Sequence, residues 1–219
     1  MRTVFLCLFV FTSTLLFAQK KKPLWTQYYD YQWKPAKAPN ISYYSVVDKT
    51  DSGYLRLDYY VRERVVQMEG YYDDDSCKIQ NGRFTYFYPS GKPERQGRYV
   101  HGKKEGLWVE VYENGRWKDS TVYRNGKAIG TSLSFFENGS VQDSIERDDL
   151  GMTTCVSWFE NGNIDYTGRY IFGNVKVQTW LYYHSNGKLA SREKYDKGRL
   201  VDKQYYDEEG RLMDTTNRD

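Results

Sequence analysis

The residues whose side chains are suited to acid–base or nucleophilic chemistry are few in this sequence, and they are widely spaced. Histidine occurs only at positions 101 and 184, which lie several predicted strands apart. His101 stands in a turn beside Gly102, and His184 stands among aromatic residues. Neither has the neighbouring nucleophile or ligands that a catalytic or metal site requires. We therefore expect no catalytic residue, no cofactor and no enzyme activity.

An acidic run, Asp73-Asp74-Asp75, is the remaining candidate for metal chemistry. Its carboxylates are the hard oxygen ligands that Ca²⁺ prefers, but three successive acids lack the alternating spacing of a calcium loop. We interpret the run as a solvated turn. A glycine-rich phosphate loop would have to open a helix, and the sequence predicts no helix. The sequence therefore predicts neither a metal site nor a phosphate-binding loop.

Composition favours a folded sheet over disorder or a helical bundle. The 219 residues include 22 tyrosines and 18 glycines but only five prolines, and 17% of them are aromatic. Disordered chains are poor in aromatic residues. Tyrosine, tryptophan, threonine and glycine are also weaker helix formers than the residues that build bundles. The length fits one domain or two small ones, and the composition predicts an all-β fold.

The first residues have the order of a secretory signal peptide. Arg2 precedes an apolar or small run from Val4 to Phe17, and Ala18 ends this run before a lysine-rich segment. The run has 14 residues, whereas a membrane-spanning helix needs about 20. We predict a signal peptide over residues 1–18, with an uncleaved N-terminal anchor as the alternative. The mature chain is then exported to the periplasm, the envelope or the medium, with no transmembrane segment after cleavage.

The charge of the mature chain argues against nucleic acid as a partner. Removal of residues 1–18 takes away one arginine and no acid, so the formal net charge falls from +3 to +2. A balance this close to zero does not supply the basic surface that nucleic acid binding needs. Export also separates the protein from nucleic acid.

Glycines recur with a period of about two dozen residues, which is the strongest pattern in the sequence. One set is spaced by 23, 24 or 25 residues: Gly91, Gly115, Gly139, Gly162, Gly187 and Gly210. A second set follows the first five by 11 or 12 residues: Gly102, Gly126, Gly151, Gly173 and Gly198. Turns this close together leave room for strands but almost none for helices. Asn-Gly pairs such as Asn114-Gly115 favour two-residue hairpin turns, because both residues tolerate a positive φ.

Each period therefore predicts one β-hairpin, and short connections predict an elongated antiparallel meander in a single-layer sheet. This repeat domain spans residues 41–219, with a degenerate unit ahead of the regular repeats. Residues 19–40 carry three prolines and five aromatic residues. We expect them to form an irregular N-terminal arm or cap laid on the first strands, with a flexible tail as the alternative.

The meander also bears on the two cysteines of the mature chain, Cys77 and Cys155. Export would permit a disulfide between them. About six strands separate the two residues, however, and at about 4.8 Å per strand they lie roughly 30 Å apart. A disulfide requires less than about 7 Å between the Cα atoms. We therefore predict two unpaired thiols.

Alternation of side chains divides each hairpin repeat into two faces. The apolar face is nearly all hydrophobic at the positions six and four residues before the first glycine of each repeat: Thr85, Phe87, Val109, Val111, Leu133, Phe135, Val156, Trp158, Leu181, Tyr183, Gln204 and Tyr206. The mixed face is formed by the positions seven, five and three residues before the same glycine. These positions combine aromatic rings with serine, glutamate and lysine, as in Trp108, Glu110 and Tyr112. We expect the apolar face to be buried and the mixed face to meet solvent and partners.

The segment GRYVHGKKEGLWVEVYENG (97–115) resembles the MORN repeat variant, the unit found in YwqK-type antitoxin components. The family pattern G-x-Y-x-x-G-K-x-x-G-x-W-x-x-Y-x-x-N-G is met at Gly97, Tyr99, Gly102, Lys103, Gly106, Trp108, Tyr112, Asn114 and Gly115. A second segment, 167–187, meets it at Gly168, Tyr170, Gly173, Trp180, Asn186 and Gly187. The resemblance covers roughly residues 65–212 and implies a MORN-like meander that mediates binding.

Non-catalytic binding is the function that these patterns favour. Rings on a sheet surface offer a large rigid contact area, so we predict a protein-interaction scaffold of the cell envelope with an unidentified protein partner. The residues best suited to contact are on the mixed face: Tyr86, Tyr88, Trp108, Tyr112, Trp180 and Tyr182. The same rings also fit a stacking ladder that holds neighbouring repeats together. Binding of carbohydrate or cell-wall glycan and an antitoxin or immunity role are the alternatives.

Overall fold

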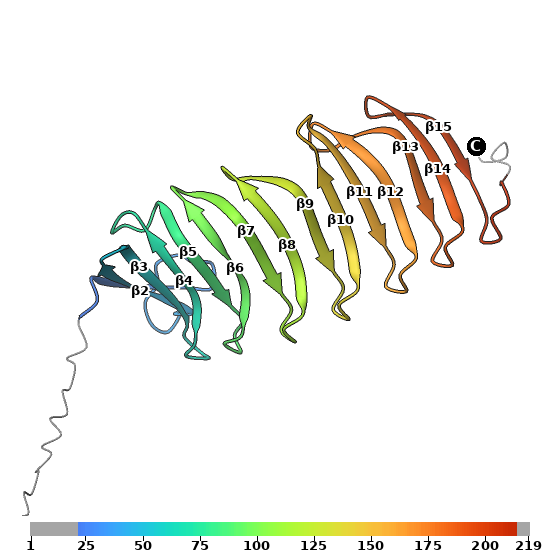
Figure 1. The fold of residues 1–219 in the computed structure, drawn as a ribbon. Coiled ribbons are helices and arrows are strands. Elements are labelled where there is room, and N and C mark those ends of the chain that lie inside the picture. Colours follow the sequence, from blue (N-terminus) through green and yellow to red (C-terminus); the bar gives the residue numbers. More distant parts are fainter. Residues whose placement is uncertain (1–21, 214–219) are drawn as a thin grey trace, which may run out of the picture.

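A computed structural model describes residues 22–213, and this part of the chain forms one open antiparallel sheet. Its 15 strands follow one another in chain order, and each is hydrogen-bonded only to its neighbours in sequence (Figure 1). None of the elements between residues 22 and 213 is a helix, so none is a long apolar helix of the kind that crosses a membrane. The predicted all-β meander of hairpins is confirmed. The predicted signal peptide, residues 1–18, lies outside the described residues.

The strands are five to nine residues long. They are β1 (Trp25–Tyr29), β2 (Tyr43–Thr50), β3 (Gly53–Tyr60), β4 (Val66–Tyr72), β5 (Gln80–Phe87), β6 (Pro93–Val100), β7 (Lys103–Val111), β8 (Trp117–Arg124), β9 (Lys127–Phe135), β10 (Val141–Arg147), β11 (Met152–Trp158), β12 (Ile164–Ile171), β13 (Val175–Tyr183), β14 (Leu189–Asp196) and β15 (Arg199–Tyr205).

The glycines of the two sets close two kinds of turn, and Gly151 of the second set lies in the longer kind. Asn125 (φ 51°) and the glycine after it (φ 81°) both take the left-handed conformation of a two-residue turn between β8 and β9. At Gly115 only the glycine has a positive φ, of 86°. The loop there is longer and closes where the N–H of Tyr112 donates to Arg116 O at 2.8 Å. The predicted two-residue turn at this position is therefore wrong, because Asn114 stays outside the left-handed region and accepts the N–H of Arg116 with its side chain.

The segment that we expected to form an irregular arm, residues 19–40, contains a strand. β1 pairs with β2, where Trp25 lies opposite Val47, so β1 is the first strand of the sheet. The indole N–H of Trp25 donates to the carbonyl of Asp75 at 2.7 Å. This bond ties β1 to the loop between β4 and β5.

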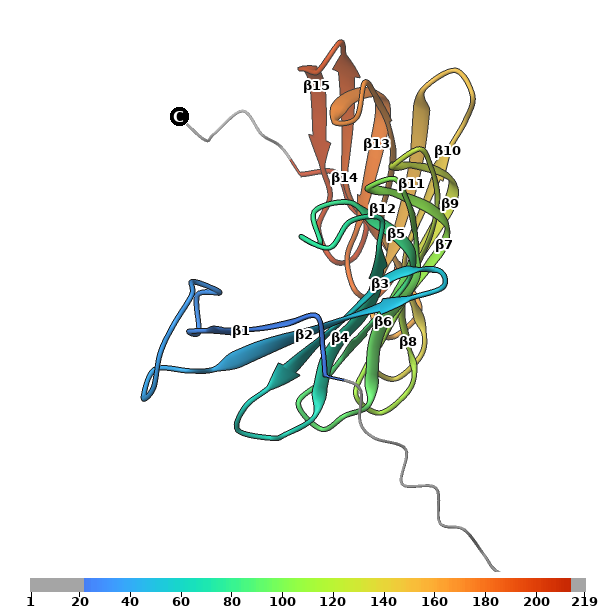
Figure 2. The same ribbon diagram turned by 90° about the vertical axis from the view of Figure 1, so that its left-hand side faces the viewer.

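The sheet twists along its length. Figure 2 shows that the direction of the strands rotates steadily between β2 at one end and β15 at the other. Such rotation is expected, because each strand has its own right-handed twist and the twist accumulates across many neighbours. An open, twisted sheet of one layer has no second layer to bury its side chains, so they must cover one another.

The first strands hold the largest group of buried side chains. Val47 and Phe84 have no exposed surface, and Met68 and Tyr72 pack with them. Polar side chains are buried beside this group as an ion pair, in which Arg56 Nε lies 2.7 Å from Asp58 Oδ1. Ser45, also fully buried, donates to the same carboxylate at 2.5 Å. The buried carboxylate is therefore both paired and hydrogen-bonded, as burial of charge requires.

Burial does not follow the predicted faces. The largest buried side chains of the repeats, Phe84, Trp108 and Trp180, lie on the mixed face. Val109 and Leu133 on the apolar face remain partly exposed. The predicted assignment of faces is wrong, because alternation shows which residues share a face but does not show which face the rings of neighbouring strands will cover.

Candidate functional site

Trp108 on β7 packs on a glycine of the preceding strand. It lies over Gly97 on β6, where an added Cβ would stand only 2.1 Å from the indole. Its indole N–H donates to Arg98 O at 3.1 Å. Tyr99 meets the indole edge-on at a centroid distance of 4.9 Å, and Lys104 Nζ lies 4.4 Å from the ring centroid. The indole is thus enclosed by its own sheet.

Trp180 on β13 repeats this arrangement. It lies over Gly168 on β12, where an added Cβ would again stand 2.1 Å from the indole. Its indole N–H donates to Arg169 O at 3.2 Å. Tyr170 packs edge-on at 4.7 Å, and Lys176 Nζ lies 4.5 Å from the ring centroid. The two arrangements hold neighbouring strands together by the same contacts.

Four of the six predicted binding residues occur around these rings. Only 3% of Trp108 and 1% of Trp180 are exposed. The guanidinium of Arg95 lies 4.2 Å from the ring centroid of Tyr86, and burial raises the pKa of Tyr86 to about 12. Tyr182 accepts a hydrogen bond from Lys176 Nζ at 2.6 Å, and burial likewise raises the pKa of Tyr182 to about 12. Their role in binding stays a prediction, and the two tryptophans have almost no exposed surface for it.

The other two predicted residues, Tyr88 and Tyr112, join each repeat to the next. The hydroxyl of Tyr88 donates to Val111 O at 2.9 Å, and that of Tyr112 donates to Phe135 O at 2.7 Å. His184 occupies the same repeat position, and its Nε2 donates to a carbonyl of the next repeat at 3.0 Å. The structure thus assigns these side chains a structural contact, and binding by the two tyrosines stays a prediction.

The turns beside these residues are linked in the same direction. Side-chain amides in three turns donate to backbone carbonyls one repeat further along the chain: Asn114 to Glu137, Asn161 to Ser185 and Asn186 to Glu208. This ladder of hydrogen bonds explains why asparagine recurs there although its φ is not positive. The asparagines therefore link successive turns along one side of the sheet.

The polar residues that we considered for chemistry form an isolated pair and a turn. His101 Nδ1 lies 2.9 Å from Asp73 Oδ2, and hydrogen bonds from Asn81 and His101 hold the pKa of Asp73 below its ordinary value. Asp74 accepts backbone N–H groups from Lys78 and Ile79 within its own loop. Between residues 22 and 213, no group of three or more histidine, cysteine, aspartate and glutamate side chains is placed to hold a metal ion.

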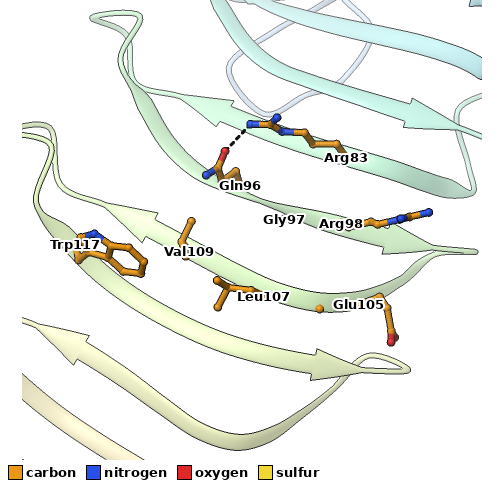
Figure 3. A pocket seen from close by; sticks show the side chains of 9 residues that line it. Arg83, Gln96, Gly97, Arg98, Glu105, Leu107, Val109 and Trp117 are labelled. Carbon is orange, nitrogen blue, oxygen red and sulfur yellow. Dashed lines mark hydrogen bonds between the residues drawn. The ribbon is translucent and has the colours of Figure 1, made fainter.

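The apolar face carries two large apolar side chains that are about half exposed. Leu107 on β7 is 55% exposed and Trp117 on β8 is 50% exposed. Together with Val109 and arginine side chains of β5 and β6 they line a recess of about 730 Å³. Figure 3 shows that Leu107, Val109 and Trp117 lie side by side on this face. Trp117 also borders a second recess of about 540 Å³, whose lining includes Leu133 and Phe135.

Cationic groups lie beside these apolar side chains. Arg83 donates to Gln96 at 2.7 Å, Arg98 stands at the same recess (Figure 3), and Arg116 lines the second one. All three are exposed. Within residues 22–213, none of the three guanidinium groups lies within 4.0 Å of a carboxylate. Glu105 also lines the first recess, where its carboxylate accepts the backbone N–H of Asn125 at 2.8 Å. The apolar face therefore has an apolar centre, with three cations and one acid at its margin.

Trp117 was absent from the predicted site, although the repeat contains a pattern that marks it. Two residues after the first glycine of each repeat, every position is apolar: Pro93, Trp117, Val141, Ile164, Leu189 and Leu212. These residues pair across the hairpin with the apolar face, for example Trp117 opposite Val111 and Val141 opposite Phe135. The second strand of each hairpin thus continues the apolar face, and reading only the first strand overlooked it.

Comparison with known families supports the hairpin repeat. A family model described as the MORN repeat variant matches residues 80–101 and residues 179–197. The first match covers β5 and β6, and the second covers most of β13 and all of β14. Each match therefore corresponds to one hairpin around a first-set glycine. No curated protein matches the chain.

Proposed function

We propose that this protein is a non-catalytic repeat scaffold of the cell envelope that holds a protein partner on its apolar face. The observation that carries the proposal is the exposure there of Leu107 and Trp117, each about half exposed. A sheet of one layer leaves this face uncovered, and contiguous exposed apolar surface marks a site of interaction. The envelope location rests on the predicted signal peptide, residues 1–18.

The margin of the apolar face defines the chemistry of the partner. Arg83, Arg98 and Arg116 offer planar guanidinium groups that pair well with carboxylates. A partner with apolar side chains flanked by aspartate or glutamate would neutralise these groups while it covers the apolar residues. Basic flanks would be repelled. The partner that fits is therefore an acidic segment with apolar side chains.

A peptide library tests this proposal directly. The mature chain is immobilised and exposed to peptides whose apolar residues are flanked by acidic, neutral or basic residues. We expect enrichment of the acidic set, and we expect Leu107→Asp and Trp117→Asp each to reduce its binding at least tenfold. Leu200→Asp is the matched control, because Leu200 is 43% exposed but lies opposite Tyr195 on the mixed face.

Three outcomes of the library experiment contradict the proposal. Enrichment of basic or neutral peptides would show that the arginines do not select the partner. Equal loss of binding in Leu200→Asp would show that the apolar face is not special. Concentration-dependent dimers that Trp117→Asp abolishes, measured by light scattering, would show that a second copy of this chain covers the face.

The other functions considered from the sequence stay predictions. Glycan binding was expected to use the ring faces of Trp108 and Trp180, which are buried, so the apolar face is the better-supported surface. Retention on peptidoglycan that Trp108→Ala and Trp180→Ala abolish would favour the glycan hypothesis. An antitoxin or immunity role is a special case of protein binding, and an exported toxin that binds the apolar face would favour it.

A further inference from the structure

The column of rings on the mixed face is interrupted at the centre of the sheet. Trp108 on β7 and Trp180 on β13 each lie over a glycine. At the same repeat position the two strands between them carry Ser132 on β9 and Cys155 on β11. Both side chains are buried but much shorter than an indole. At the centre the bulk of one indole is therefore replaced by two smaller side chains, one from each strand, as in Ile145 with Cys155.

The neighbours of the missing indoles differ as well. In the flanking repeats a tyrosine and a lysine face each other across the strands, as Tyr99 opposite Lys104 and Tyr170 opposite Lys176. At the centre the corresponding pairs are Tyr123 opposite Ala128 and Arg147 opposite Thr153. The lysine that covers the indole is thus absent from both central units, and the enclosing tyrosine is absent from the unit of β10 and β11.

These substitutions produce a recess of about 670 Å³ across β9 to β12. Its lining includes Ala128, Ile145, Arg147, Thr153, Cys155 and Tyr170. The recess lies on the mixed face and is separate from the two recesses beside Trp117. A departure from a repeat's own pattern at several adjacent positions is where function is expected, because packing alone would favour the regular residues.

One cation in this recess is available to a ligand. Arg147 Nη1 donates to Ser132 Oγ at 2.8 Å. Within the described chain no carboxylate lies within 4.0 Å of the Arg147 guanidinium. Asp148, at the edge of the recess, accepts the backbone N–H groups of Leu150 and Met152. The Asp148 carboxylate is therefore hydrogen-bonded within its own turn, and the Arg147 guanidinium has N–H groups that can donate to an anion.

The rim adds a second positive charge and an exposed ring. Lys127 and Phe172 both border the recess, and Phe172 is 86% exposed. Phe172 also has a φ of 50°, which is costly for a bulky residue. The equivalent turn positions carry His101, Asn125 and Lys197 with similar φ values. A phenyl ring here gains no burial, but it lies where it can contact a ligand in the recess.

We propose that this recess binds a small aromatic carboxylate. The ring of the ligand takes the place of the missing indole against Ile145, Cys155 and Tyr170, and its carboxylate pairs with the guanidinium of Arg147. A planar apolar ring suits the apolar lining, and a bidentate contact suits the fixed fork of arginine. The site is independent of the apolar face, so either binding activity can fail without the other.

Indole-3-acetate is the probe that tests the site, with indole-3-acetamide as its uncharged counterpart. Titration calorimetry on the mature chain should show saturable binding of the acetate, with the acetamide at least tenfold weaker. Arg147→Gln should weaken binding of the acetate at least tenfold. Arg98→Gln, on the opposite face, is the matched control and should leave binding unchanged. No saturable acetate binding, equal binding of the acetamide, or unchanged binding by Arg147→Gln would each overturn the proposal.

Cysteine labelling provides a second measurement on the unaltered protein. Cys155 lines the recess, whereas Cys77 lies in the loop between β4 and β5. Saturating indole-3-acetate should slow alkylation of Cys155 at least threefold and leave Cys77 unchanged. Equal rates with and without the ligand would overturn the proposed position. The double variant Ile145→Gly, Cys155→Trp should fill the recess and abolish binding, and retained binding in this folded variant would also overturn it.

Discussion

The central strands of the sheet differ from the strands on either side in how they fill the position that Trp108 and Trp180 occupy. In β6–β7 and β12–β13, all of the bulk is on one strand, where a tryptophan lies over a glycine. At the centre, Thr121 on β8 with Ser132 on β9, and Ile145 with Cys155, divide the bulk between two strands. The first solution closes the surface, and the second leaves a recess. One backbone register therefore supports either a closed or an open unit.

The last unit of the sheet shows a third solution. Glu193 on β14 stands where Gly97 and Gly168 stand, and Lys203 on β15 stands where the tryptophans stand. Lys203 Nζ lies 2.7 Å from Glu193 Oε1. An ion pair thus replaces the ring between β14 and β15. The two facing positions therefore accept different residue types, provided that the two side chains match each other in size or in charge.

Removal of a buried indole should be the most damaging single change. We expect Trp180→Ala to lower the free energy of unfolding by about 3–5 kcal/mol, because it removes apolar burial and leaves a cavity. Cys155→Ala at the centre should cost less than about 1.5 kcal/mol. Trp117→Ala, on the exposed face, should change stability by about 0.5 kcal/mol or less. Urea unfolding measures all three, and equal losses would contradict the distinction between closed and open units.

Addition of a methyl group beneath an indole should be the next largest effect. The Cβ of Gly168→Ala would stand 2.1 Å from the ring of Trp180, so the indole must move, at a cost of about 1–3 kcal/mol. The same substitution in a Trp180→Ala background should cost markedly less, because the clash is gone. A double-mutant cycle measures the difference. Additive losses would show that Gly168 is required for its backbone and not for the ring.

The unit of β8 and β9 should pack like the flanking repeats when a tryptophan on one strand faces a glycine on the other. Ser132→Trp alone should destabilise the protein by about 1–3 kcal/mol, because Thr121 occupies part of the space. The added change Thr121→Gly should recover about 1 kcal/mol or more. Thermal unfolding of the two variants decides the matter. No recovery in the double variant would mean that the centre of the sheet differs from its neighbours in backbone as well as in side chains.

The ion pair at the last unit should make its stability depend on pH. Burial acts to raise the pKa of Glu193, but hydrogen bonds from Lys203 and Tyr195 outweigh it, so this pKa lies below its ordinary value. A carboxyl with a lowered folded-state pKa contributes its full stability above about pH 4.3, its unfolded pKa, and loses it as the pH falls through the folded pKa. The protection factors of the β14 and β15 amides in hydrogen exchange should therefore fall below about pH 4. Glu193→Gln should remove this dependence, and an unchanged pH profile would contradict the role of the pair.

The thiols should show the smallest effect, a difference in reactivity without a change in fold. Cys77 and Cys155 are both buried and unpaired within residues 22–213, as we predicted. Burial raises the pKa of Cys77 to about 11 and also raises that of Cys155, so little thiolate forms near neutral pH. Both should react slowly in the folded mature chain and fully in urea. Mass spectrometry measures the two labels, and an intramolecular disulfide would contradict the open sheet.

The spacing of the glycines was enough to predict the hairpins. Turn residues every 11 to 14 positions leave only short strands, and each such strand pairs with its neighbour in the chain because the connections are short. The same reasoning correctly separated Cys77 from Cys155. It did not predict β1 within residues 19–40, where prolines and rings indicated an irregular arm or cap and five residues pair with β2.

The site was harder to predict because it depends on contacts between strands. Trp108 and Trp180 were chosen as binding residues for their rings, but Gly97 and Gly168 on the preceding strands let those rings sink into the sheet. Trp117 was passed over because only the first strand of each hairpin was used to assign the faces. Its exposure follows from its place opposite Val111 on the uncovered face.

By itself, the sequence determined the all-β class, the order of the strands and which side chains share a face, because these follow from local backbone geometry and from turns that join nearest neighbours. Only the tertiary structure decided which face is buried and where recesses form. Those features depend on which residues of adjacent strands meet, and a ring on one strand is covered only if the next strand leaves room for it. That condition holds at Gly97 and Gly168 and is absent at Ile145.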